Sequence, residues 1–230
     1  GRSLTTYDQA LALVSALDSA GVKAVRAIVG ASYGGMVALA FGAIAPQRVR
    51  RLVVIGAAHE SAPAATALRL LQRRVVRLGL ATGRSHEALV LARGMAMTSY
   101  SSADEFDRRF ARAASHDADK RSGAIGDFLQ LSGESFAHDC TPERFLALSE
   151  SLDSHQVRPE EVRVPTTLIA VREDALVPID QVQHLARNIG ASCRLVELSS
   201  SHGHDTFLNA HHLIAPFVAD ALFAANGIES

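Results

Sequence analysis

The sequence has few of the residues that mark a secreted, disulfide-stabilised or metal-binding protein. It has only two cysteines in 230 residues, Cys140 and Cys193, and neither lies in a Cys-x-x-Cys pair or at a metal-ligand spacing. Aromatic residues make up 5 % of the chain and tryptophan is absent, so aromatic stacking platforms are not expected. We therefore expect two reduced thiols.

Strong net charge and long apolar runs are also lacking. The 23 basic and 24 acidic residues give a net charge of −1, which argues against nucleic acid or an anionic membrane as the main partner. No apolar run approaches the ~20 residues of a membrane span. The first residues also lack an apolar signal-peptide core. The sequence predicts a cytoplasmic protein that acts on small molecules.

Short β-branched runs alternate with helical patterns, which predicts an α/β fold with a parallel sheet. Hydrophobic residues make up 48 % of the chain, enough for a substantial core. After a first helix that begins near Thr5, four buried strands are expected, at residues 25–29, 51–55, 166–171 and 194–198. Helices are expected at 36–45, 179–188 and from 207 to about 225.

The alternation stops between the second and third expected strands. This segment has helical patterns at roughly 64–79, 86–97, 103–113 and 143–153 and no convincing strand. We expect a core formed by residues 1–58 and 164–230, with residues 59–163 inserted as a helical lid.

A serine stands in a glycine-rich turn between the first strand and the next helix. Residues 30–34 read Gly-Ala-Ser-Tyr-Gly, and this strand–turn–helix context is typical of the nucleophile elbow of an α/β-hydrolase. The turn exposes the hydroxyl of Ser32 and directs the N–H of Tyr33 at the oxygen of an attacked carbonyl, as half of an oxyanion hole.

The acid and base that activate this serine are expected at the ends of later strands. In this fold the chain order is Ser, Asp or Glu, then His. Asp174 or its neighbour Glu173 follows the third strand, and His204 or His202 lies in the loop after the last strand. His211 and His212, in the closing helix, are expected to be surface or packing residues. No matching ligands lie near these histidines, so no metal site is expected.

Several segments resemble the homoserine O-acyltransferases, which transfer acetyl or succinyl groups from coenzyme A. Residues 30–36 resemble that family's elbow, Gly-Gly-Ser-Met-Gly-Gly-Met, with departures at Ala31 and Tyr33. Residues 173–178 resemble its acid loop, Ser-Asp-x-Leu-Phe-Pro. Residues 203–208, Gly-His-Asp-Thr-Phe-Leu, closely match its Gly-His-Asp-Ala-Phe-Leu.

The resemblance implies roles for individual residues. It favours Asp174 over Glu173 and His204 over His202, so Ser32, Asp174 and His204 would form the catalytic triad. Two lid positions and one position beside the histidine would bind the amino-acid substrate, namely Arg93, Tyr100 and Asp205.

The implied reaction moves the acyl group from acetyl-CoA or succinyl-CoA to Ser32 and then to homoserine, with no bound cofactor. Alternatives are serine as the acceptor, a serine esterase with the same triad, and a non-catalytic fragment. Helical lids of the family suggest a homodimer.

Only one helix precedes the first strand, where a full α/β-hydrolase has several strands. We therefore expect another N-terminal segment to complete the sheet and the oxyanion hole.

Overall fold

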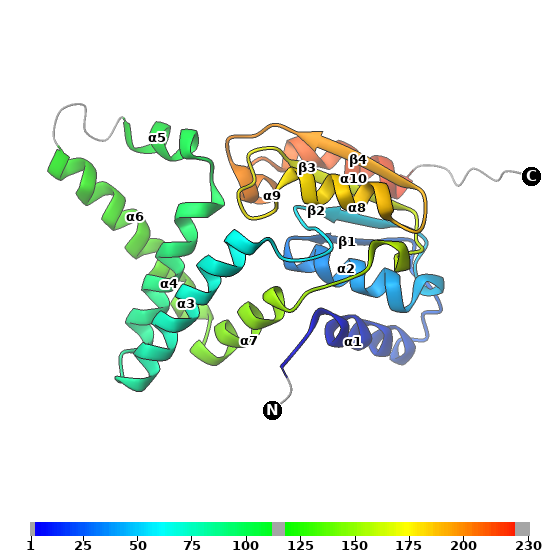
Figure 1. Cartoon of the computed structure of the whole chain (residues 1–230), viewed down its shortest axis with the longest axis horizontal. Helices are drawn as coiled ribbons and strands as arrows, with labels where there is room; N and C mark the ends of the chain where they lie inside the picture. Colours follow the sequence, from blue (N-terminus) through cyan, green and yellow to red (C-terminus); the bar gives the residue numbers. More distant parts are fainter. Residues whose placement is uncertain (1–2, 112–117, 224–230) are drawn as a thin grey trace, which may run out of the picture.

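The computed structural model describes residues 3–111 and 118–223, and its central element is a parallel sheet. The sheet has four strands, in the order β1 (Ile28–Ala31), β2 (Leu52–Ile55), β3 (Thr166–Val171) and β4 (Cys193–Leu198). Figure 1 shows the sheet on one side of the molecule and a separate group of helices on the other. The predicted α/β fold with a parallel sheet is confirmed.

Helices cover both faces of the sheet, and alternate residues of each strand point to opposite faces. Leu52 and Val54 of β2 belong to the larger core, and Val53 and Ile55 belong to a second one. Three helices pack on the larger core, α1 (Thr6–Ser19), α2 (Tyr33–Ile44) and α8 (Ile179–Asn188). The second core is covered by α10 (His211–Phe223), which follows the short α9 (Thr206–Asn209).

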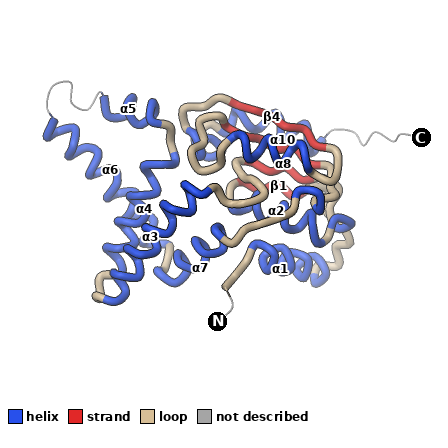
Figure 2. The backbone as a smooth tube through the Cα atoms, in the orientation of Figure 1, coloured by secondary structure: helices blue, strands red, loops and turns tan. Residues whose placement is uncertain are grey.

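Between β2 and β3 the described chain is helical apart from turns and one isolated bridge, as the tube colours of Figure 2 show. We call residues 63–153 the helical insert. It contains α3 (Pro63–Ala81), α4 (Ser85–Tyr100), α5 (Ala103–Ala111), α6 (Ala118–Asp139) and α7 (Pro142–Asp153). A small apolar core of its own, around Val76 and Leu89, holds α3, α4, α6 and α7 together.

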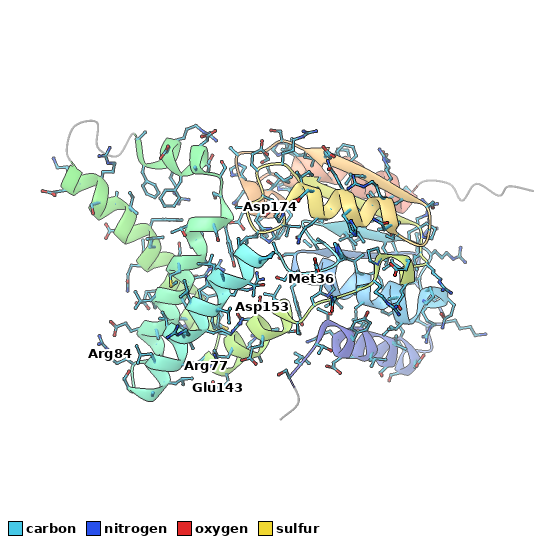
Figure 3. All side chains as sticks on the ribbon, in the orientation of Figure 1. Met36, Arg77, Arg84, Glu143, Asp153 and Asp174 are labelled. Carbon is cyan, nitrogen blue, oxygen red and sulfur yellow. The ribbon has the colours of Figure 1, made fainter. Side chains whose placement is uncertain are left out.

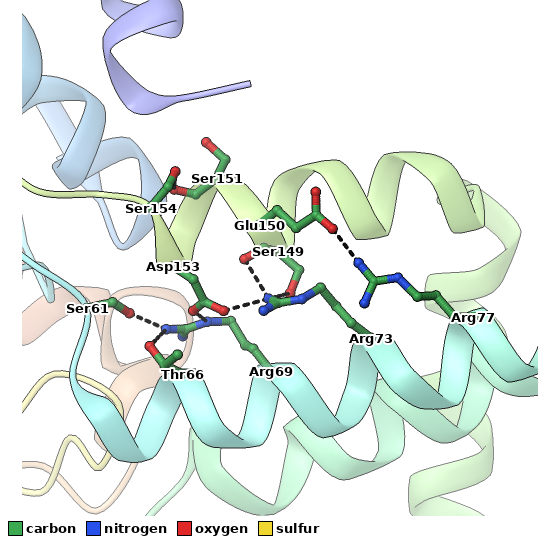
Figure 4. Close-up of polar contacts among 10 residues, drawn as sticks. All are labelled: Ser61, Thr66, Arg69, Arg73, Arg77, Ser149, Glu150, Ser151, Asp153 and Ser154. Atoms are coloured by element: carbon green, nitrogen blue, oxygen red, sulfur yellow. Dashed lines mark hydrogen bonds and ion pairs between the residues drawn. The ribbon is translucent and has the colours of Figure 1, made fainter. Parts of the chain in front are cut away.

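Charged side chains join α3 to α7 (Figure 4). Asp153 lies between two arginines, with one oxygen 2.6 Å from Arg69 Nε and the other 2.6 Å from Arg73 Nη1. Arg73 also donates to the carbonyl and the hydroxyl of Ser149. We call Arg69, Arg73 and Asp153 the Arg–Asp cluster.

The helical insert leaves the sheet and returns to it at one place. Glu60 and Gln156 form an antiparallel bridge, and the N–H of Val157 donates to the carbonyl of His59 at 2.8 Å. We call this paired segment the stalk. It lets the insert be long without disturbing the pairing of β2 with β3.

His155 fixes the stalk against the first helix. Its Nδ1 lies 2.8 Å from Thr6 Oγ1 and its Nε2 lies 3.2 Å from the carbonyl oxygen of Ala58. The ring is buried, and burial disfavours the charged form and lowers its pKa to about 4.

Some element boundaries differ from the sequence prediction. The first strand is Ile28–Ala31, and Val25 makes only an isolated bridge to Val49. Helix α2 begins at Tyr33, three residues earlier than expected, and the closing helix is broken at Ala210. Within the described residues, no helix is long and apolar enough to cross a membrane.

Helix α6 was not predicted. Three glycines in its 22 residues lower its helix propensity. Close packing explains one of them, because a Cβ on Gly133 would lie 2.6 Å from both Val90 Cγ1 and the Val90 carbonyl oxygen of α4. A Cβ on Gly126 would meet no atom within 4 Å.

The two glycines give a matched test of this packing. Gly133→Ala should destabilise the protein by about 1–3 kcal/mol, because α6 must move away from α4. Gly126→Ala should raise the unfolding free energy by up to ~1 kcal/mol through helix propensity alone. Urea unfolding followed by circular dichroism measures both, and equal effects of the two changes would contradict the close contact.

His155 should make stability depend on pH. Between pH 4 and 6.5 the unfolded chain binds a proton at His155 that the folded chain does not bind, so the unfolding free energy falls as pH falls. The loss should approach ~3 kcal/mol across this window. His155→Gln should remove that part of the slope, whereas His86→Gln, on the exposed surface, should keep it. Urea unfolding at pH 7 and pH 4.5 measures the difference in unfolding free energy between the two pH values. If this difference is the same in His155→Gln as in the wild type, burial does not hold the ring neutral.

Candidate active site

Ser32 lies in the turn between β1 and α2, where the backbone is strained. Its φ of 50° makes it the one non-glycine residue with positive φ among the described residues. Gly30 permits this turn, because a Cβ there would lie 2.2 Å from the carbonyl oxygen of Gly34. The Ser32 N–H donates to the carbonyl of Ile55 at 2.8 Å, which holds the turn against the end of β2. Such a local strain is typical of a functional site.

His204 follows β4, the strand at the opposite side of the sheet from β1, and its loop leaves from the same carboxyl end as the Ser32 turn. It lies in a short 3-10 turn (Gly203–Asp205) after β4, and its Nε2 is 2.8 Å from Ser32 Oγ. Its Nδ1 is 2.7 Å from Asp174 Oδ2. Since an ionised carboxylate only accepts hydrogen bonds, the proton of the neutral ring belongs on Nδ1, and Nε2 accepts from the serine hydroxyl.

Asp174 follows β3, and its orientation is fixed by its own backbone turn. Its Oδ1 accepts hydrogen bonds from the N–H groups of Leu176 and Val177, at 2.8 and 3.0 Å. Oδ2 therefore remains free for the ring of His204. Asp174 and His204 are both buried, so water competes little for this contact. Figure 3 labels Asp174 at the loop that faces the helical insert.

The alternative acid and base lie elsewhere. Glu173 binds Ser199 Oγ and the N–H of Ser200, and these hydrogen bonds outweigh the effect of burial and keep its pKa below the usual range. The N–H of His202 donates to Ser200 Oγ. Glu173 thus steadies the loop that leads to His204, and the geometry joins Ser32, His204 and Asp174.

Ser32 and His204 line a cavity of about 560 Å³ beneath the helical insert. The opposite wall comes from α3, α4, α6 and α7 and includes polar, charged and apolar side chains. Among them are Arg69, Gln72, Arg93, Tyr100, Phe136 and Leu148. A site covered by helices in this way reduces the access of water to a reactive intermediate.

The predicted substrate residues are only partly brought together. Arg93 Nη1 lies 3.3 Å from the hydroxyl of Tyr100, and both side chains line the cavity. The Arg93 guanidinium also lies over the rings of Tyr100 and Phe136, 4.9 and 5.1 Å from their centroids. Asp205 is buried behind His204 and is not among the described residues that line the cavity. Burial raises its pKa.

Tyr33 makes a contact that the sequence did not suggest. As the first residue of α2, its N–H has no acceptor within the helix and is available beside Ser32. Its phenolic oxygen lies 2.7 Å from the hydroxyl of Ser151, a fully buried residue of α7. The residue after the nucleophile is therefore tied to the helical insert.

Arg69 is another cavity residue that the sequence analysis missed. Residues 69, 73 and 77 are arginines spaced four apart in a predicted helix, so they share one face, and this spacing was the available signal. Within residues 3–111 and 118–223, the structure contains no group of three or more histidine, cysteine or acidic side chains arranged to hold a metal ion.

Comparison with known proteins identifies relatives along most of the chain. Homoserine O-succinyltransferase of Xanthomonas campestris pv. campestris is 36% identical over 95% of this chain and 59% of its own length. Homoserine O-acetyltransferase of Thermus thermophilus is 34% identical over 89% of this chain and 54% of its own. Serine O-succinyltransferase of Xylella fastidiosa is 29% identical over 90% and 63%. The chain thus spans somewhat more than half the length of these relatives.

Structural comparison agrees on the fold. The crystal structure of homoserine O-acetyltransferase from Bacillus anthracis superposes with a TM-score of 0.81 at 16% identity, over 96% of this chain and 66% of that one. The family model described as alpha/beta hydrolase fold matches residues 3–210. The relatives of similar sequence are named homoserine and serine O-acyltransferases. This chain therefore belongs to the α/β-hydrolase fold family.

Proposed function

We propose that this chain transfers an acetyl or succinyl group from acyl-CoA to the hydroxyl of L-homoserine, a step of methionine biosynthesis. The observation that carries the proposal is the hydrogen-bonded series Ser32–His204–Asp174, of which Ser32 and His204 line a cavity beneath the helical insert. The names of the relatives support acyl transfer to an amino-acid hydroxyl. No bound cofactor is needed, because acyl-CoA is a substrate.

In the first half of the reaction, Ser32 Oγ attacks the thioester carbonyl while His204 Nε2 takes the hydroxyl proton. The carbon–sulfur bond breaks, and the proton passes to the thiolate of coenzyme A. Asp174 holds the ring in the tautomer that accepts this proton and stabilises its charged form. The N–H of Tyr33 donates to the oxyanion of the tetrahedral intermediate.

In the second half, the homoserine hydroxyl attacks the acyl-enzyme while His204 accepts its proton. The intermediate collapses, the proton returns to Ser32 Oγ, and the O-acyl amino acid leaves. Arg93, supported by Tyr100, is proposed to bind the carboxylate of the amino acid through a charge-assisted contact. Asp205, which lies outside the cavity lining but close enough to interact electrostatically with Arg93 and His204, is proposed to attract its ammonium group through its charge. The helical insert acts as the lid that keeps water from the acyl-enzyme.

Serine as acceptor is the closest alternative, since one methylene changes binding by only about 1–3 kcal/mol. One of the relatives is named a serine O-succinyltransferase. Parallel assays with homoserine and serine at equal concentrations decide between the two acceptors. Transfer to water alone would identify a hydrolase.

Ser32→Ala tests the acyl-enzyme. With acyl-CoA, the wild-type chain should gain the mass of one acyl group and release thiol, and homoserine should accelerate release and remove the adduct. Ser32→Ala should show neither adduct nor release above background, because it removes the hydroxyl that lies 2.8 Å from His204 Nε2. Intact-mass spectrometry and a thiol assay follow both. Thiol release that ignores homoserine would reject the transferase proposal.

The same assay tests the expected need for an additional N-terminal segment. Full activity of the 230-residue chain alone would show that no additional segment is required for catalysis. The same result would reject the non-catalytic alternative.

Arg93→Gln tests the proposed carboxylate contact. The change should lower kcat/KM for homoserine about 10–100-fold, the usual effect of losing a hydrogen bond to a charged group, while acyl-enzyme formation changes much less. Arg84→Gln is the control, since Arg84 pairs with Glu87 at the exposed end of the helical insert, where Figure 3 labels it. A parallel loss in both half-reactions would place Arg93 outside the acceptor site.

A further inference from the structure

The Arg–Asp cluster carries a surplus of buried positive charge. Two guanidinium groups share the single carboxylate of Asp153, which leaves a net charge of +1 (Figure 4). The side chains of Arg69, Arg73 and Asp153 are only 14%, 6% and 12% exposed. A cation that is shielded from water and incompletely balanced attracts an anion more strongly than a surface arginine does.

Only one arginine of the cluster faces the cavity. Arg73 is saturated by Asp153 and Ser149 and is not among the described lining residues. Arg69 lines the cavity together with Ser61, whose hydroxyl it contacts through Nη2. The described hydrogen bonds of Arg69 run from Nε to Asp153 and from Nη2 to Ser61 and Thr66. Among the described residues none accepts from Nη1, which therefore remains available to a ligand.

The other arginines of the cavity differ from Arg69. Arg93 is stacked on Tyr100 and Phe136, at the position proposed for the amino-acid carboxylate. Arg144 also lines the cavity, but its side chain is exposed. The cavity that contains Ser32 therefore has a second buried cation on a different helix from Arg93. One amino-acid substrate has only one carboxylate, so this cation calls for a second anionic group.

We propose that Arg69, with Ser61, binds a carboxylate at the far end of the acyl group of the donor. The chain would then use a dicarboxylic acyl donor, of which succinyl-CoA is the simplest candidate, in preference to acetyl-CoA. The inference rests on the proposed function, because it concerns the donor of that reaction. An acetyl group ends in a methyl group and would leave Nη1 of Arg69 without an anion, whereas a terminal carboxylate can accept a charge-assisted hydrogen bond from it.

The relatives do not decide the donor by name, since both succinyl- and acetyltransferases occur among them. The same guanidinium could instead meet a phosphate of coenzyme A. The two sources are separable because succinyl-CoA and acetyl-CoA share every phosphate and differ only in the acyl group.

The test measures donor binding without turnover. In the Ser32→Ala background, isothermal titration should give a Kd for succinyl-CoA about 10–100-fold lower than for acetyl-CoA. Adding Arg69→Gln should reduce this ratio to near one. Adding Arg77→Gln instead should preserve it, because Arg77 pairs with Glu150 two turns along α3, outside the cavity lining.

Equal affinities for the two donors in Ser32→Ala, or no binding of either, would overturn the proposal. So would an Arg69→Gln variant that weakens both donors by the same factor, which would assign Arg69 to the phosphates or to structure. If Arg69→Gln fails to fold, Ser61→Ala in the Ser32→Ala background takes its place, and an unchanged ratio there would overturn the assigned site. A preference for succinyl-CoA without homoserine-dependent thiol release would reject the proposed acceptor and keep the donor site.

Discussion

Three side chains from distant parts of the sequence meet because all four strands are parallel and end at the same edge of the sheet. Ser32, Asp174 and His204 follow β1, β3 and β4, and strand pairing brings these three loops together. The distances of 2.7 and 2.8 Å along the series are therefore set by the register of the sheet as well as by local turns. A change of register would separate the serine from its base even if every loop kept its shape.

The helical insert completes the site by a different kind of attachment. The sheet is held by apolar contacts on both faces, whereas the contacts between the insert and the core include polar pairs, such as Tyr33 with Ser151 and Ser102 with the Ser201 carbonyl. Buried polar pairs add little net stability, but they accept only one geometry, since a displaced partner leaves an unsatisfied group. These contacts therefore define where the cavity wall lies over Ser32.

Much of this arrangement could be predicted from the sequence. The turn around Ser32, the loop of Asp174 and the loop of His204 are short local patterns, and a parallel sheet dictates that they meet. Helix α6 was missed because local propensity penalises its glycines, while the contact of Gly133 with Val90 joins segments far apart in the sequence. The burial of Asp205 and the sharing of Asp153 by two arginines likewise depend on tertiary packing, which spacing along one helix cannot reveal.

The stalk at Glu60 and Gln156 has a consequence for how such proteins diverge. Since the insert departs and returns at a single paired point, its helices can lengthen, shorten or be exchanged while the strands and the reactive loops stay in place. Selection can then alter which molecules enter the cavity without rebuilding the groups that carry out bond making and breaking. The range of substrates can therefore change through the insert while the reaction chemistry, carried by the loops of the sheet, stays the same.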